Sequence, residues 1–202
     1  LLIKQAVTMP PPRDPAKVAR LADLSTKLES MYGTGKYCRA GETGEQCRDI
    51  EALTKVMAES RDYDELLDVW LGWHRIGPPM RPLYTEFVSL MNEGARELGF
   101  ADTGALWKGG YDMSSEAFEQ EADRLWQQVK PLYEELHCYV RAKLGDHYGK
   151  DKIRPHGAIP AHLLGNMWAQ EWNNVFEVVR PYPAGGSVVD IDGALARQKY
   201  HP

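Results

Sequence analysis

The longest run of helical periodicity in this 202-residue chain spans residues 115–148. Its apolar residues recur at intervals of three, four or seven: Phe118, Leu125, Val129, Leu132, Leu136, Val140 and Leu144. That spacing places them on one face of an α-helix, which Pro131 is expected to kink. No alternating run of five or more residues rich in Val and Ile predicts a strand, and residues 182–191 form a loop with room for at most one short strand. We therefore expect an all-α fold.

Shorter helices are predicted before this segment, with no domain boundary between them. Asp62 is expected to cap a helix whose apolar face includes Leu66, Val69, Trp70 and Trp73. The Gly-Pro-Pro sequence at 77–79 should break that helix. The remaining helices are expected at 14–32, 49–59, 81–98 and 102–108.

Composition is ordinary for a globular protein, with 43% hydrophobic and 26% charged residues. The net charge of −5 does not favour nucleic acid or an anionic membrane as a partner. No run of eighteen apolar residues predicts a membrane segment in this chain. The N-terminal sequence is not a recognisable signal peptide, which does not exclude secretion because a trimmed chain would have lost it.

The cysteines allow more than one interpretation. Cys38 and Cys47 flank the sequence CRAGETGEQC, a loop short enough to bring them within bridging distance. Spacing alone leaves open whether they form a disulfide or two free thiols. Their separation and the lack of a nearby His pair argue against a zinc site. Cys138 falls within the long helical pattern and is interpreted as a small core residue.

Residues 159–172, IPAHLLGNMWAQEW, are predicted to form a buried helix beside a site. On such a helix Trp168 and Trp172 share one face, whereas Gln170 lies about 200° round from Trp168. His156 and His162 are interpreted as hydrogen-bonding or surface residues rather than metal ligands, and the tryptophans as core residues by default. The chain contains no His-Glu-x-x-His, Gly-x-Ser-x-Gly or Walker sequence, so its own residues do not make a complete enzyme.

Six sequences occur in an order that matches one known family: KYC…QC (36–47), VMAESRDYDELL (56–67), WLGW (70–73), RPLYTEF (81–87), PLYEELHCYVRAKL (131–144) and IPAHLLGNMWAQEW (159–172). Together they closely resemble the angiotensin-converting enzyme family of zinc peptidyl-dipeptidases. The resemblance covers essentially residues 14–202, including the tail DIDGALARQKYHP.

The resemblance implies that residues 1–202 are a partial segment of one peptidase catalytic domain. That domain would be a large, two-lobed helical metallopeptidase with a deep central channel. The lid helices before this segment, and the zinc-binding half after it, would be absent from the chain. The zinc ligands and all catalytic residues would therefore lie outside it. The remaining segments of the same protein would be its partners.

The complete enzyme is expected to be secreted and to remove C-terminal dipeptides from oligopeptide substrates. One alternative is a catalytically inactive homologue that keeps the channel as a peptide-binding or receptor surface. Another is a free-standing helical fragment without function.

The resemblance also implies roles for individual residues. Gln170 matches a glutamine whose amide binds the C-terminal carboxylate of the substrate, and Glu51 and Thr54 match a pocket for a substrate side chain. Tyr111 matches a tyrosine that contributes to a chloride site. Cys38 and Cys47 match a disulfide-bonded pair, which favours an extracellular location.

Two positions depart from the family pattern. Glu171 replaces a threonine that is common there. His74 stands directly after the second Trp of WLGW, where chloride-dependent relatives carry an arginine, and Arg75 follows it. Because a neutral imidazole cannot replace a permanent guanidinium charge, the outer chloride site is expected to be absent or weakened unless Arg75 takes that place.

Overall fold

A computed structural model describes residues 7–182, 193, 195, 197 and 198. Almost all of the loop expected at 182–191 therefore lies outside the described residues. Every named element in the described part is helical, and the only pairing of extended residues there is an isolated bridge between Tyr37 and Arg48. The all-α prediction is confirmed.

The helices follow the predicted order closely. The α-helices are α2 (Pro15–Gly33), α3 (Ile50–Glu59), α4 (Tyr63–His74), α5 (Gly77–Glu97), α6 (Thr103–Lys108), α7 (Ser115–Tyr148) and α8 (Phe176–Val179). Three short 3₁₀ helices are η1 (Gly44–Gln46), η2 (Ala161–Leu163) and η3 (Trp172–Val175). Five of the α-helices begin directly after an Asp or Ser whose side chain accepts a first-turn backbone N–H, which satisfies a donor that the helix itself cannot.

The Gly-Pro-Pro sequence separates α4 from α5, but α5 begins at Gly77 rather than near residue 81. Pro78 and Pro79 fit within the first turn, because the backbone N–H groups of that turn have no intrahelical acceptor to lose. The Gly-Pro-Pro sequence thus follows shortly after the end of α4 and forms the first turn of α5.

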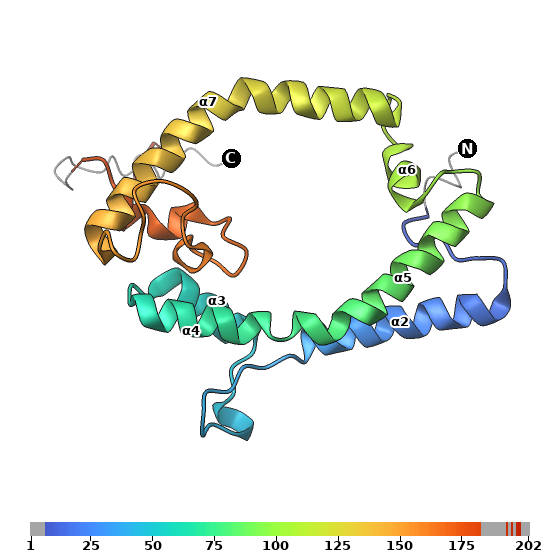
Figure 1. The fold of residues 1–202 in the computed structure, drawn as a ribbon, viewed down its shortest axis with the longest axis horizontal. Coiled ribbons are helices and arrows are strands. Elements are labelled where there is room, and N and C mark those ends of the chain that lie inside the picture. Colours follow the sequence, from blue (N-terminus) through green and yellow to red (C-terminus); the bar gives the residue numbers. More distant parts are fainter. Residues whose placement is uncertain (1–6, 183–192, 194, 196, 199–202) are drawn as a thin grey trace.

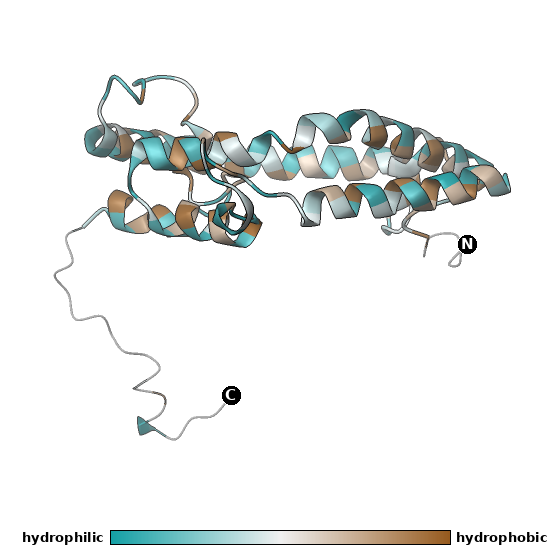
Figure 2. Cartoon of the chain, turned by 90° about the horizontal axis from the view of Figure 1, so that it is seen from below, coloured by the Kyte–Doolittle hydropathy of each residue, from teal (hydrophilic) through white to brown (hydrophobic). Residues whose placement is uncertain are grey.

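The helices form an open ring in Figure 1. Helix α2 packs along α5 at the lower right, α3 packs on α4 at the lower left, and α6 connects α5 to α7. Residues 159–179, coloured orange, lie between α4 and the C-terminal half of α7. From below, the helices lie in a flattened body with hydrophobic and hydrophilic residues intermixed along each (Figure 2).

The main core lies where α3, α4 and the end of α7 meet the segment after residue 150. Fourteen buried apolar residues form it: Tyr37, Leu53, Met57, Leu66, Val69, Trp73, Val140, Leu144, Ile153, Ile159, Leu163, Leu164, Met167 and Val179. Burying a side chain of this size stabilises a fold by roughly 1.5–3 kcal/mol. This cluster therefore stabilises the contact of α3 and α4 with the end of α7 and the segment after it.

Helix α7 is continuous over its predicted length and changes direction in its yellow middle part, as expected of a helix that contains Pro131 (Figure 1). Its apolar face is buried only near the C-terminal end, at Val140 and Leu144. Further toward the N-terminus the face is exposed, and Leu132 keeps 72% of its accessible surface. The other exposed apolar residues of this face are Leu125, Trp126, Val129, Tyr133 and Leu136.

Cys138 is exposed, so its interpretation as a core residue is wrong. It lies two residues before Val140, which turns its side chain about 200° away from the buried face of α7.

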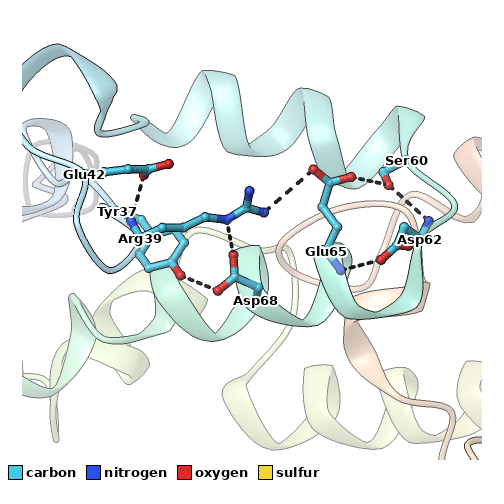
Figure 3. Close-up of polar contacts among 7 residues, drawn as sticks. All are labelled: Tyr37, Arg39, Glu42, Ser60, Asp62, Glu65 and Asp68. Atoms are coloured by element: carbon cyan, nitrogen blue, oxygen red, sulfur yellow. Dashed lines mark hydrogen bonds and ion pairs between the residues drawn. The ribbon is translucent and has the colours of Figure 1, made fainter.

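The disulfide loop is fixed to α4 by polar contacts (Figure 3). Cys38 and Cys47 are bonded, as the resemblance implied, with their Cα atoms 4.3 Å apart. Beside this bond the Tyr37 hydroxyl donates to one oxygen of Asp68, and Arg39 Nε donates to the other over 2.6 Å. Asp68 therefore connects Tyr37 and Arg39, at the start of the disulfide loop, to helix α4.

The charge state of Asp68 reflects these contacts. Burial alone would raise the pKa of its carboxyl, but hydrogen bonds from Tyr37 and Arg39 outweigh burial and hold that pKa below its ordinary value. The pKa of the Tyr37 hydroxyl is raised by burial and by its bond to Asp68. Asp68 therefore accepts both bonds as a carboxylate at neutral pH.

We predict that Asp68→Asn lowers the free energy of unfolding by about 1–2 kcal/mol, since the amide keeps the shape but loses the charge that both donors face. The low end of that range is expected because Arg39 and Asp68 are partly exposed. Urea unfolding of the protein at pH 7 measures the change. Asp123→Asn is the control, since Asp123 is exposed and pairs with no described cation. Equal effects of the two variants would contradict the role given to Asp68.

Candidate functional site

Residues 159–172 do not form the predicted helix. Within this range only Ala161–Leu163 (η2) and Trp172, the first residue of η3, are helical, and the chain makes a compact turn between them. Gly165 (φ 87°) and Ala169 (φ 58°) both adopt left-handed backbone angles. Trp168 and Trp172 therefore do not share one helical face.

Two neighbouring residues explain why a helix is not formed here. A Cβ at Gly165 would overlap the carbonyl oxygen of Glu171, so the chain can cross itself only at a glycine. The side-chain oxygen of Asn166 accepts the backbone N–H groups of Trp168 and Gln170 over 3.0 and 3.1 Å. An Asn side chain that captures nearby backbone donors in this way competes directly with helical hydrogen bonding.

Three further side chains complete the hydrogen bonding of the turn. The Trp70 indole N–H, from α4, donates to the carbonyl of Met167 over 3.1 Å. The Trp172 indole N–H donates to the carbonyl of Ala169 over 3.0 Å. Asn174 Nδ2 donates to the carbonyl of Gly165 over 3.0 Å. Residues 165–174, which we call the glutamine loop, are thus held at both ends and in the middle.

Four residues of the glutamine loop are exposed: Trp168, Gln170, Glu171 and Asn173. Gln170 is exposed, and its side-chain amide makes no hydrogen bond to a described residue. Trp168 is 51% exposed, so its interpretation as a core residue is wrong, whereas Trp73 is buried and Trp70 half-buried. An exposed side-chain amide and an exposed indole, on a loop whose backbone is held by these hydrogen bonds, are the arrangement expected of a binding site rather than of a core.

Glu51 and Thr54 lie on α3, one helical turn apart, with Glu51 exposed and Thr54 half-buried. Helix α3 packs against η3, which begins two residues after Gln170. The three residues predicted to bind substrate are therefore on adjoining elements, although no hydrogen bond joins their side chains.

Tyr111 is separate from this group. It lies on the connection between α6 and α7, is 54% exposed and stacks on Phe118 with ring centres 4.4 Å apart. That connection is at the opposite end of α7 from the glutamine loop (Figure 1). The structure does not bring Tyr111 together with Gln170.

His74 is exposed at the end of α4 with its ring 4.0 Å from that of Trp70. Its Nδ1–H donates to the Trp70 carbonyl over 2.7 Å, so Nε2 is the nitrogen left for other partners. His74 lines a pocket of about 170 Å³ together with Tyr32, Trp73 and Trp168. This pocket adjoins the glutamine loop through Trp168.

The described residues contain no group of three or more His, Cys, Asp or Glu side chains that could hold a metal ion. A zinc ion does not fit the side chains described here, and no chemical step through one can be derived from them. Nor is any helix among these residues long and apolar enough to cross a membrane.

His156 is exposed, in line with its interpretation as a surface residue, but His162 is not. His162 keeps only 5% of its accessible surface and forms a T-shaped pair with Tyr63, with ring centres 4.7 Å apart. Its Nε2 has no described hydrogen-bond partner. Burial lowers the pKa of His162 to about 4, against a smaller opposing effect of Asp64. His162 is therefore a neutral core residue at pH 7.

Comparison with known proteins identifies the relatives of this chain. The family model Peptidase_M2, described as angiotensin-converting enzyme, matches residues 3–202. Angiotensin-converting enzyme of Sus scrofa is 42% identical over 189 residues, which cover 93% of this chain and 14% of that protein. The enzyme of Oryctolagus cuniculus is 44% identical over 83% of this chain and 13% of its own length. That of Theromyzon tessulatum is 38% identical over 90% of this chain and 29% of its own length. The chain thus spans a minor part of these relatives.

The burial of His162 predicts that the protein loses stability as the pH falls from about 6.5 to about 4. In that range the unfolded state binds a proton at this histidine and the folded state does not, so acid favours unfolding. The loss should total on the order of 3 kcal/mol. Unfolding free energies measured in urea from pH 4 to 7 test this prediction. His162→Gln should flatten the dependence and His156→Gln should not, whereas an unchanged slope in His162→Gln would contradict it.

Proposed function

Because the chain belongs to the angiotensin-converting enzyme family of peptidases, we propose that it is a segment of the catalytic domain of a zinc-dependent peptidyl-dipeptidase. The complete enzyme removes dipeptides from the C-terminus of oligopeptides. This segment contributes part of the channel wall and recognises the C-terminal carboxylate of the substrate. The observation that carries the proposal is the exposed Gln170 amide on a firmly held loop.

The chemistry of Gln170 suits this role. An enzyme that removes two residues at a time must locate the free end of its substrate, and that end is a carboxylate. The Gln170 side chain offers two N–H donors, and no described group competes for them. An uncharged amide also binds a carboxylate without the desolvation cost of burying a cation. Gln170 is thus suited to measure the distance from the substrate's end to the cleaved bond.

Glu51 and Thr54 would line the neighbouring side-chain pocket. Glu51 is exposed in the first turn of α3, and α3 packs on the element that follows Gln170. A carboxylate in that position attracts a basic side chain of the substrate. Thr54, one turn further, adds a hydroxyl that can donate or accept.

We further propose that the zinc ligands and catalytic groups lie in other segments of the same protein. The exposed apolar face of half of α7 supports this. A continuous apolar face of this kind normally meets another surface. The Cys38–Cys47 disulfide supports an extracellular location.

Replacing Gln170 tests the proposed role directly. In the complete protein, Gln170→Ala should lower kcat/KM roughly 10- to 100-fold for a peptide with a free C-terminus, mainly through KM. The same peptide with an amidated C-terminus should change less than about twofold, because it carries no carboxylate to lose. Gln120→Ala, at an exposed glutamine of α7, is the matched control. Equal losses on both peptides would contradict carboxylate recognition.

The same assay separates the enzyme from a non-catalytic homologue. Hydrolysis of an N-terminally blocked tripeptide should stop on chelation and return with added zinc. Peptide binding without hydrolysis at any zinc concentration would favour a receptor or peptide-binding surface.

For chloride, we propose that Tyr111 donates its hydroxyl to one anion and that the outer site beside His74 is absent or weakened. Tyr111 is exposed, and His74 carries no permanent charge. Crystals of the complete protein soaked in bromide should show anomalous density at Tyr111 and none beside Trp73. Strong density next to Trp73 would contradict the second part of the proposal.

A further inference from the structure

Asn166 stands at the start of the turn that carries Gln170. It keeps only 1% of its accessible surface, so it does not reach solvent or a bound peptide. Its side-chain oxygen accepts the N–H groups of Trp168 and Gln170, and its main-chain carbonyl accepts that of Ala169 over 3.2 Å. One buried residue thus binds three successive backbone N–H groups, from 168 to 170.

The turn includes a backbone conformation that needs such support. Ala169 has φ 58°, a region that residues other than glycine seldom occupy. Because Ala169 directly precedes Gln170, its backbone angles determine the direction in which the Gln170 side chain leaves the turn. The bonds from Asn166 are made on both sides of Ala169, at residues 168 and 170.

Only one end of the Asn166 carboxamide serves the turn. Its Oδ1 accepts two hydrogen bonds, whereas its Nδ2 is buried without a described partner. An aspartate would therefore preserve the acceptor that the turn uses, but an alanine would remove it. This asymmetry distinguishes a specific backbone acceptor from a residue that merely fills space.

We propose that Asn166 is a positioning residue for peptide binding: its side-chain oxygen fixes the backbone of Gln170 so that the amide faces the substrate carboxylate. The proposal rests on the proposed function of Gln170. Asn166 acts through Gln170 and does not touch the substrate. Because the backbone of Gln170 is already fixed before the peptide binds, binding does not have to order it, and this conformational entropy is not lost on binding.

The test uses the complete protein and the pair of peptides with free and amidated C-termini. Asn166→Ala should lower kcat/KM for the free peptide about tenfold through KM, because a donor displaced by about an ångström no longer meets the carboxylate. The amidated peptide should change less than about twofold. Asn166→Asp, which keeps the acceptor oxygen, should retain more activity than Asn166→Ala. In a Gln170→Ala background, Asn166→Ala should have no further effect on the free peptide.

Asn92→Ala provides a matched control, because Asn92 also accepts a backbone N–H, that of Thr103, over 3.0 Å, but far from the glutamine loop. Asn92→Ala should change kcat/KM of the two peptides to the same extent. If Asn166→Ala does not fold, Asn166→Ser serves instead, since its shorter side chain keeps an oxygen but cannot hold both N–H groups. Faster hydrogen exchange of the Gln170 and Trp168 amides in Asn166→Ser would support the proposal independently of activity.

The outcomes separate the proposal for Asn166 from the proposal for Gln170, on which it rests. If Gln170→Ala lowers kcat/KM equally for the two peptides, the carboxylate role of Gln170 is wrong, and so is the proposal for Asn166. If Gln170→Ala lowers kcat/KM more for the free peptide and the Asn166 variants do not, only the proposal for Asn166 is overturned. Equal loss on both peptides in Asn166→Ala, or an undiminished loss in the Gln170→Ala background, would also overturn it.

Discussion

The packing of residues 159–179 between α4 and the end of α7 is the contact on which the site depends. Leu163 and Met167 from this segment enter the same core as Val69, Trp73 and Leu144. The apolar contacts bring the segment to α4, and the bond from Trp70 to the Met167 carbonyl then fixes its position along that helix. Without this core the glutamine loop would have no fixed surface to be held against.

Much of the helical framework could be predicted from sequence because its signals are local. Asp14, Asp49, Asp62 and Asp102 each precede a helix and accept hydrogen bonds from its first turn, so the residue type alone marks the boundary. The Gly-Pro-Pro sequence marked a boundary too. Its exact position was missed, because the same prolines that end one helix suit the first turn of the next.

The glutamine loop could not be predicted from periodicity because its shape comes from contacts that periodicity does not contain. Trp168 and Trp172 have helical spacing, yet Gly165 must pass close to the Glu171 carbonyl and Asn166 captures the donors of the next turn. The Gly-Asn pair at 165–166 is the local signal that favours a turn. The exposed face of α7 shows the opposite case: the helix was predicted correctly, but burial depends on partners that the helix itself cannot specify.

We propose that this segment of an angiotensin-converting enzyme family member presents the Gln170 side-chain amide to the end of a peptide. A crystal structure of the complete protein with a bound peptide tests this claim most directly. We predict Gln170 Nε2 within about 3 Å of a C-terminal carboxylate oxygen, with the glutamine loop unchanged. A peptide whose carboxylate is bound elsewhere, with the Gln170 amide directed into the protein, would contradict it.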